Sequence, residues 1–488
     1  MQALPTGSST TRPPRQSGPG GRPEPAREAP AEPGARWIWA LTGALFLVYT
    51  TLSVRIHERM LSNSYDLGIF EQVIRSYADG HLPVSELKAP GFPVLGDHFS
   101  PVLALVAPFY LLWRSPVTLL VVQAALVAAS TPPLARWARR TLGTTAAVLI
   151  GLCYGLSWGI ASAIGFDFHE VAFAVPLLAL SLTALGQDRL RAAVCWALPL
   201  LLVKEDLGLT VVAIGLVVAR RGGRGLGLVT AAAGLAGSLL AILLVLPSVN
   251  PSGDFAYWSF LGGRGGGGGV GNLLYKGTVG LITPEAKTTT LVLVLAPTLF
   301  LALRSSLVWV ALPTLVWRFA SNGYVHWGTG YHYSLVLMPI VFAAFVDALV
   351  ARRARPDSVR RYLAGATAVT LLLLPRFPFW QLVQPATWRT DPRLAVAQRL
   401  MDRIPDGATV QASNVLVPQL TNRTTVGLFG WEPSRPDPQW IIVDTWAPWS
   451  KRWPLTAEIE RNRLNWHRAH GYHDVADEDG YVLLGRSR

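Results

Sequence analysis

The chain has 488 residues, of which 51% are hydrophobic and only 15% are charged. Soluble domains carry about 25% charged residues, so the composition excludes an ordinary soluble protein. The net charge of +13 could suggest nucleic acid, but the basic residues stand in short clusters between apolar blocks, and no nucleic-acid partner is expected.

The first 35 residues differ in composition from the rest of the chain. They are rich in Pro, Gly, Ser and Arg and contain no apolar block. This composition predicts a disordered tail, which we place in the cytoplasm. The first apolar run, Trp37–Leu52, lacks a convincing small-residue cleavage site, so it is interpreted as a signal anchor.

Residues 36–375 are dominated by apolar blocks. A helix that crosses a membrane needs about 20 mostly apolar residues, and one soluble core could not bury so many blocks of this length. The pattern predicts an all-α polytopic membrane domain with about eleven transmembrane helices. We place them at residues 37–54, 117–135, 143–163, 171–187, 190–203, 207–219, 225–247, 289–303, 305–318, 334–351 and 359–375.

A further apolar segment, Pro101–Trp113, would be only about 20 Å long as a helix. Counting it as a crossing would invert the topology of everything that follows. We predict an interfacial helix on the outer side, because this choice keeps the cluster Arg136–Arg140 inside.

The basic loops indicate an orientation. With the tail inside, the inner loops hold the clusters Arg136–Arg140, Arg189–Arg191, Arg220–Arg224 and Arg352–Arg361, which is the positive-inside pattern. The outer side then receives the first outer loop 55–100, the long outer loop 248–288 and residues 376–488. We expect a multi-pass protein of the plasma membrane with a cytoplasmic N-terminus and an extracytoplasmic C-terminal domain.

The first outer loop contains an amphipathic pattern that begins near Asp66. Apolar residues recur at helical spacing, at Leu67, Phe70, Val73, Ile74 and Tyr77, which predicts a helix lying on the membrane surface. Asp66 could serve only as the N-cap of this helix. Alternatively, its carboxylate lies where a lipid-linked substrate presents its head group, and general-base catalysis needs such a group.

Two more polar clusters are predicted on the same side. Asp97 and His98 end the first outer loop, and Asp167, His169 and Glu170 lie between two passages. Ionisable residues close to a bilayer are costly, which favours a function, although caps or an ordinary polar turn would also explain them. The five side chains would offer oxygen and nitrogen ligands to a divalent cation such as Mg²⁺ or Mn²⁺, although their spacing matches no metal motif.

Lys204, Glu205 and Asp206 are three consecutive charges inside an apolar stretch, which is hard to explain as a solvated face. Lys204 could bind a phosphate as a point charge, or it could pair with Glu205 or Asp206. The aromatic stretch 317–333, which includes His332, is predicted on the same side. Its rings could stack on a sugar or form an interfacial belt.

The pattern changes after residue 375. Arg393–Ile404 has a helical period, and three segments are typical of short strands, namely Ala408–Ala412, Trp440–Asp444 and Tyr481–Leu484. Residues 376–488 are therefore predicted to form a small α/β domain. We recognise no catalytic constellation in it.

Four polar motifs carry a resemblance to a known family. The sequences NSYDLGIFEQ, GDHFSP, GFDFHE and KED, in this order and before a soluble tail, resemble those of the bacterial membrane-protein family called domain of unknown function 2079, from Trp37 to the end of the chain. That family is similar to the GT-C glycosyltransferases, such as protein mannosyltransferases and aminoarabinose transferases. Those enzymes have a catalytic acidic residue in the first outer loop and use a polyprenyl-phosphate sugar donor. The resemblance implies that Asp66 is this acid, although Leu67 follows it where a paired acidic motif is more familiar, which leaves the exact base open.

The leading hypothesis is thus a GT-C-type transferase that moves a sugar from a polyprenyl-phosphate donor to an envelope glycan, lipid or protein acceptor on the outer face. Asp66 would deprotonate the acceptor hydroxyl, and Lys204, His332 or a bound cation would neutralise the phosphate. The other side chains named above would line the pocket. Two alternatives stay open, namely a transporter or lipid flippase that uses the charges at 204–206, and a non-enzymatic component of cell-envelope assembly.

Overall fold

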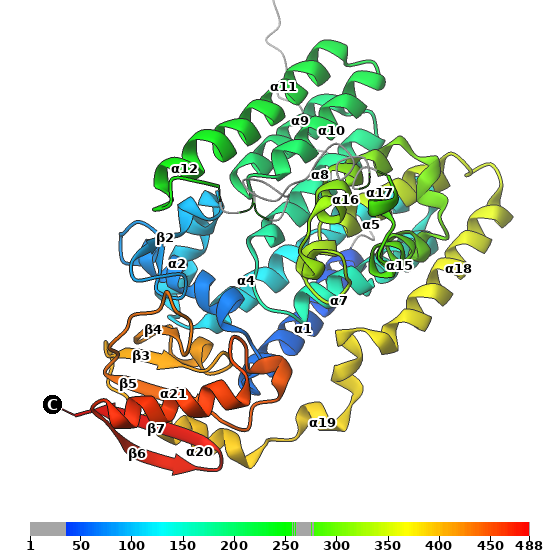
Figure 1. Ribbon diagram of the computed structural model, residues 1–488. Helices are drawn as coiled ribbons and strands as arrows, with labels where there is room; N and C mark the ends of the chain where they lie inside the picture. The colour runs from blue at the N-terminus through cyan, green and yellow to red at the C-terminus, as the bar shows by residue number, and fades with distance from the viewer. Residues whose placement is uncertain (1–35, 256, 258, 260–274, 276–277, 488) are drawn as a thin grey trace, which may run out of the picture. The chain divides into compact units, whose positions relative to one another are not determined.

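Apolar helices of different lengths make up much of the chain. The structure, a computed structural model, describes residues 36–255, 257, 259, 275 and 278–487, so the predicted tail 1–35 and part of the long loop 248–288 lie outside the described residues. Within the described residues, four segments are long and apolar enough to cross a membrane, and a pair bent by 43° would make a fifth. The four are Arg36–Glu58 (α1), Pro116–Leu142 (α4, Pro116–Ala129, and α5, Thr131–Leu142), Arg224–Val249 (α11, Arg224–Leu240, and α12, Leu246–Val249) and His332–Val350 (α17, Leu337–Val350). The bent pair is α6 (Thr144–Gly155) and α7 (Trp158–Ile164). Figure 1 labels α7 and the helices of the four long segments.

Other apolar helices are shorter than a full crossing. They are Pro101–Leu112, Glu170–Gly186 (with α8, Ala174–Gly186), Leu190–Leu202 (with α9, Leu190–Ala197), Leu207–Arg220 (α10) and Ser306–Ala320 (with α16, Leu312–Ala320). Pro199 and Pro313 lie where helical geometry changes, since proline lacks the N–H that an α-helix needs. The two remaining predicted passages correspond to α15 (Glu285–Leu295) and α18 (Pro356–Leu373). The chain is thus a mostly helical membrane protein with four or five clear candidate spans in its described part, and the count of eleven stays a prediction.

The segment Pro101–Leu112 consists of a 3-10 stretch, Pro101–Val106, followed by α3 (Ala107–Leu112). It exposes Leu105, Phe109 and Leu112 and buries Val106 and Tyr110. A short helix with one apolar exposed face fits the interfacial helix expected from the sequence.

The C-terminal part contains a five-stranded sheet within the described residues. Its strand order is β4 (Thr425–Leu428), β3 (Thr409–Ala412), β5 (Trp440–Asp444), β7 (Tyr481–Arg486) and β6 (Tyr472–Glu478). The first three strands are parallel, and β7 is antiparallel to both of its neighbours. The helices of this part are α19 (Pro385–Trp388), α20 (Pro392–Met401) and α21 (Ala457–Ala469). The predicted helix and all three predicted strands are present, whereas β4, β6 and α21 were not foreseen.

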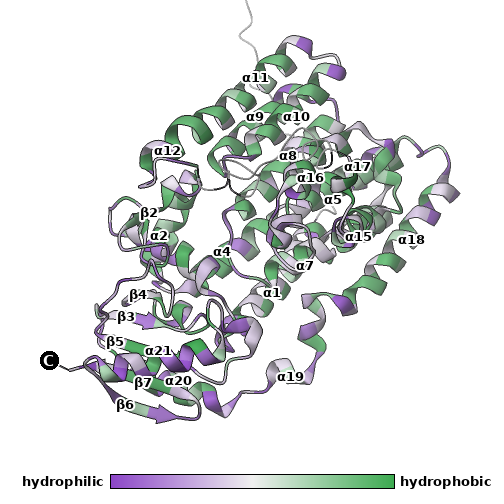
Figure 2. Ribbon diagram, viewed as in Figure 1, coloured by the Kyte–Doolittle hydropathy of each residue, from purple (hydrophilic) through white to green (hydrophobic). Residues whose placement is uncertain are grey.

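The sheet packs against the first loop of the membrane domain. That loop contains α2 (Ile69–Ala78) and a two-stranded ribbon, β1 (Val84–Ser85) with β2 (Phe92–Pro93). Phe70 and Ile74 of α2 share a hydrophobic core with residues of β3 and β4, and Gln72 Nε2 donates a hydrogen bond to Val426 O at 2.8 Å. The apolar face of α2 is therefore covered by protein, and the prediction that it lies on a membrane surface is wrong. Figure 2 shows the contrast between the hydrophobic α11 and the more hydrophilic α20 and α21.

Candidate functional site

Five segments that are far apart in the sequence meet at one place. They are the turn Ser64–Gly68 before α2, the loop 96–100, the segment 165–170 after α7, the turn 203–206 before α10 and the segment 331–333 before α17. Direct side-chain contacts join them, from the first loop to 169, from 169 to 332, from 170 to 204 and from 205 to 98. The charged motifs of the sequence are thus parts of one cluster.

Asp66 lies in the π-helical turn Ser64–Gly68 that precedes α2. Its side chain caps neither that turn nor α2, so the N-cap interpretation is wrong. The Oδ1 atom of Asp66 lies 2.9 Å from Nε2 of His169, and the side chain keeps 23% of its surface exposed. The ring of His169 in turn stacks on the ring of His332, with 3.5 Å between centroids. Asp66 is therefore a carboxylate that is held in place and still accessible.

Asp167 is a buried carboxylate close to Asp66. Its Oδ2 accepts two hydrogen bonds from Asn63, one from the backbone N–H at 2.9 Å and one from Nδ2 at 2.8 Å. Burial, together with the negative charge of Asp66, raises the pKa of Asp167 to about 7. Its φ of +141° is a conformation that L residues rarely adopt and that costs on the order of 1–3 kcal/mol. Gln123 of α4 fixes this turn through hydrogen bonds to Asp167 O at 2.7 Å and His169 N at 2.9 Å.

Lys204 pairs with Glu170, and the Nζ–Oε1 distance is 2.7 Å. The sequence suggested Glu205 or Asp206 as partner, so this pairing corrects that expectation. Glu170 keeps only 1% of its side chain exposed, and an unpaired charge there would be costly. Burial lowers the pKa of Lys204, but the three surrounding carboxylates outweigh it and raise the pKa well above its usual value. A cavity of about 20 Å³, enough for about one water molecule, is lined in part by Lys204, Asp206, His332 and Tyr333.

His98 links the cluster to the loop after α12. Its Nδ1 lies 2.8 Å from Glu205 Oε1, and its Nε2 lies 2.7 Å from the hydroxyl of Tyr257. The neighbouring Asp97 pairs with Lys88 at 2.8 Å. Burial alone would raise the pKa of Asp97, but the charge of Lys88 and other nearby cations hold it below its usual value.

The structure brings the predicted site residues together but not as the predicted metal site. Among the residues that the structure describes, no group of three His, Cys, Asp or Glu side chains is arranged to hold a metal ion. The reason is that each of the five expected ligands has its own protein partner: Asp97 with Lys88, His98 with Glu205, Asp167 with Asn63, His169 with Asp66, and Glu170 with Lys204.

Three residues next to the cluster were not predicted from the sequence, namely Asn63, Asn414 and Lys451. Asn63 belongs to the motif NSYDLGIFEQ, so its place in the motif was a signal that could have been used. Asn414 and Lys451 come from the C-terminal part and contact the segment 61–64. Nothing in their local sequence distinguishes them from surface residues.

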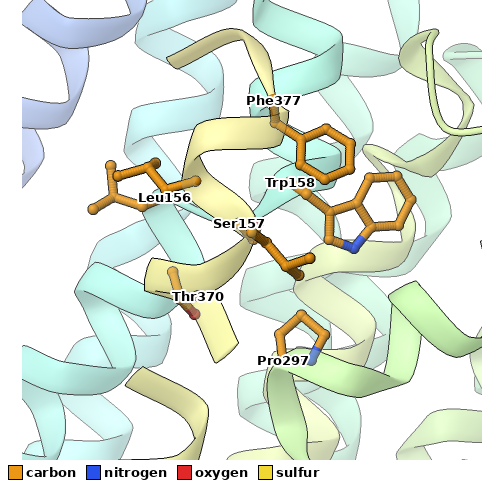
Figure 3. Close-up of a pocket in the computed structure, with 8 residues that line it drawn as sticks. Leu156, Ser157, Trp158, Pro297, Thr370 and Phe377 are labelled. Carbon is orange, nitrogen blue, oxygen red and sulfur yellow. The ribbon is translucent and has the colours of Figure 1, made fainter. Parts of the chain in front are cut away.

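A second depression lies at the break between α6 and α7 (Figure 3). It is lined by Leu156, Ser157, Trp158, Pro297, Thr370, Leu373, Leu374 and Phe377. It has no room for a water molecule, and none of these lining residues is titratable. This depression therefore offers no titratable group for acid–base chemistry, and the charged cluster is the candidate site.

Comparison with known proteins decides the family. The family model described as "Predicted membrane protein (DUF2079)" matches residues 56–483. The chain belongs to this family. The resemblance inferred from the four motifs is thus confirmed, and the DUF2079 chain is a multi-pass membrane protein whose orientation stays a prediction. None of the curated proteins matches it.

Two solved structures share the fold of this DUF2079 protein. One is the crystal structure of ArnT from Cupriavidus metallidurans bound to undecaprenyl phosphate, with a TM-score of 0.50, 13% identity and coverage of 92% of this chain and 98% of that chain. The other is ArnT from the same organism in the apo state, with a TM-score of 0.50, 14% identity and coverage of 93% and 98%. At this level of identity, the similarity establishes an ArnT-like fold.

Proposed function

We propose that this protein is a GT-C-type glycosyltransferase that moves a sugar from a polyprenyl-phosphate donor to an acceptor on the outer face of the membrane. The observation that carries the proposal is Asp66, an accessible carboxylate held by His169 at the edge of a buried charge cluster that includes Lys204. The ArnT-like fold supports it, because a structure of ArnT was obtained with undecaprenyl phosphate bound.

The division of roles between the two neighbouring carboxylates follows from their surroundings. Asp167 is buried, and its pKa of about 7 means that it takes up a proton more readily than an ordinary carboxyl group. Two close carboxylates are costly to ionise together, so a proton held on Asp167 lowers the cost of placing the two groups side by side. Asp66 is also the more exposed of the two, which suits a group that must reach a substrate.

In the proposed reaction the acceptor hydroxyl attacks the anomeric carbon of the donor sugar. Asp66 accepts the hydroxyl proton as the new C–O bond forms, and the bond between that carbon and the phosphate oxygen breaks. The lipid phosphate leaves with the electron pair of the broken bond. His169 keeps the carboxylate of Asp66 in one orientation throughout.

Lys204 is the cation proposed to face the departing phosphate. An ammonium group has three N–H donors and a positive charge, and the Nζ of Lys204 lies 2.7 Å from Glu170 Oε1. Donors that point toward the phosphate, together with the positive charge, would stabilise the charge that develops on the phosphate oxygen. His332 lines the same small cavity beside Lys204 and would contribute to the shape of the pocket.

The test compares wild type with Asp66→Asn and with the matched control Asp79→Asn. Asp79 lies on the same loop, at the end of α2, and pairs with Arg114 outside the cluster. Membranes carrying each variant receive undecaprenyl phosphate linked to labelled hexoses or pentoses, and the release of undecaprenyl phosphate is measured. We expect Asp66→Asn to lower the turnover by about 10²-fold or more, and Asp79→Asn to leave it within about twofold. Full activity of Asp66→Asn would remove Asp66 as the base, and a wild type that neither turns over any donor nor binds undecaprenyl phosphate would refute the function.

A further inference from the structure

Lys451 reaches from the C-terminal part into the candidate site. It lies in a 3-10 turn, Trp449–Lys451, between β5 and α21. Its Nζ donates hydrogen bonds to Leu61 O at 2.5 Å and to Asn63 Oδ1 at 3.1 Å. The side chain therefore joins two segments that are 388 residues apart, with most of the membrane domain between them.

Asn63 is hydrogen-bonded to both Lys451 and Asp167. Because its Oδ1 accepts from Lys451, its Nδ2 faces the other way, and both Nδ2 and the backbone N–H donate to Asp167 Oδ2. The result is a continuous chain of hydrogen bonds from Lys451 through Asn63 to Asp167. Asp66 lies three residues after Asn63, in the turn that begins at the residue held by these hydrogen bonds.

Asn414 supplies a second brace from the same part of the protein. Its Oδ1 accepts hydrogen bonds from the backbone N–H of Ser64 at 3.0 Å and from Ser64 Oγ at 2.7 Å. Its Nδ2 donates to Lys451 O at 3.3 Å, so the two braces are themselves connected. The first N–H groups of a helical turn have no acceptor within the turn. Here Asp167 accepts from the N–H of Asn63, and Asn414 accepts from the N–H of Ser64.

The positive charge of Lys451 interacts with the negative charges of Asp167 and Asp66. No carboxylate among the described residues lies within ion-pair distance of its Nζ. Burial lowers the pKa of Lys451, and the negative charges of Asp167 and Asp66 oppose this effect. A partly buried cation without a direct ion pair depends on such nearby charges. Lys451 and the two carboxylates are thus electrostatic neighbours.

We propose that Lys451 is a positioning residue for Asp66, and that the C-terminal sheet thereby completes the catalytic site. This inference rests on the proposed function, in which Asp66 is the base. Lys451 does not touch the reacting atoms; it fixes the segment Leu61–Ser64 through Asn63, and the braced segment sets where the carboxylate of Asp66 points. A misplacement of a catalytic group by about 1 Å can cost about 100-fold in rate.

The experiment uses the full-length chain with Lys451→Met, Lys451→Arg and the control Arg468→Met. Arg468 is a partly exposed cation of the same part of the protein and pairs with Asp474, away from the first loop. Hydrogen exchange is measured on peptides that cover residues 61–67, and turnover of the undecaprenyl-phosphate sugar is measured as kcat and KM. We expect Lys451→Met to speed exchange in these peptides and to lower kcat about 10- to 100-fold with the donor KM within about twofold. Lys451→Arg should recover most of kcat, and Arg468→Met should change neither quantity.

Two results would overturn the proposal. One is unchanged exchange at 61–67 in Lys451→Met. The other is an equal loss of kcat and of thermal midpoint in Lys451→Met and Lys451→Arg, because that result would make Lys451 a structural residue only. If wild type turns over no donor, the proposed function fails, while the exchange measurement still decides whether Lys451 fixes the segment.

Discussion

Glu71 allows a quantitative test of how the C-terminal sheet is held to the first loop. Its side chain is fully buried in α2, where Tyr110 donates a hydrogen bond to Oε1 at 2.9 Å and Thr421 donates one to Oε2. Burial raises the pKa of Glu71 from its usual 4.5 to about 7, although these hydrogen bonds oppose the rise. Substitution by Gln removes the ionisation and keeps one hydrogen bond to each partner, since its oxygen can accept and its amide can donate.

The expected effect follows from proton binding. Between pH 4.5 and 7 the folded chain keeps the proton on Glu71 while the unfolded chain releases it, so the free energy of unfolding falls as the pH rises. The difference between the pKa values of Glu71 in the folded and unfolded chain changes the free energy of unfolding by about 3 kcal/mol, at 1.36 kcal/mol per pKa unit. Relative to wild type, Glu71→Gln should therefore gain about 3 kcal/mol between pH 4.5 and pH 8, or about 6 °C in thermal midpoint at about 2 °C per kcal/mol.

The assay is the thermal midpoint of the full chain in detergent at several pH values. Glu86→Gln serves as the control, because Glu86 lies on the same loop and pairs with Arg435 near the surface. If wild type and Glu71→Gln show parallel pH dependence over this range, the argument that Glu71 is a buried, proton-binding contact is wrong.

Two further substitutions test the packing of the site. Lys204→Met should lower the free energy of unfolding by about 3–5 kcal/mol because it leaves Glu170 buried without a partner. The double variant with Glu170→Gln should regain part of this loss. If the losses of thermal midpoint in the two single variants simply add in the double variant, the pairing is wrong. Gly96→Ala places its methyl group 2.5 Å from Asn250 N, a backbone atom, and should cost about 1–3 kcal/mol. Gly43→Ala meets open space and should not lower the thermal midpoint, so an equal effect of the two alanines would refute the steric reason.

Composition and charge predicted that the chain is a membrane protein, and they pointed to the polar motifs that the structure brings together at the candidate site. Hydrophobic blocks indicate membrane helices because only long apolar helices are stable in the hydrocarbon core of a bilayer. Ionisable residues close to that core cost free energy, so the polar motifs between the blocks suggest a function. Asp66, His169 and Lys204 were recognised for this reason. The number of crossings was harder to predict, because residues such as Pro199 and Pro313 interrupt apolar runs that look continuous in composition.

The partners within the site could not be predicted in the same way. The partners considered for Lys204, as an alternative to phosphate binding, were its neighbours in sequence, but its ion-pair partner Glu170 is 34 residues away and is brought near by helix packing. The apolar face of α2 has the same spacing whether a membrane or a protein covers it, so the sheet that covers Phe70 was not foreseen. Lys451 stands in a loop between tryptophans, and only the docking of the sheet gives it a role.

The order of the bracing residues along the chain has a consequence for biosynthesis. The segment Leu61–Ser64 is made long before its hydrogen-bond partners, since Asn414 follows Ser64 by 350 residues and Lys451 follows Leu61 by 390 residues. Until the sheet has folded and docked, the N–H and side-chain groups of Ser64 have no Asn414 to bind. A chain that is truncated before residue 451 would contain every predicted membrane passage and still lack the hydrogen bonds from Lys451 to Leu61 and Asn63. Any transfer reaction that depends on this geometry would thus begin only after residue 451 has been made and the sheet has docked.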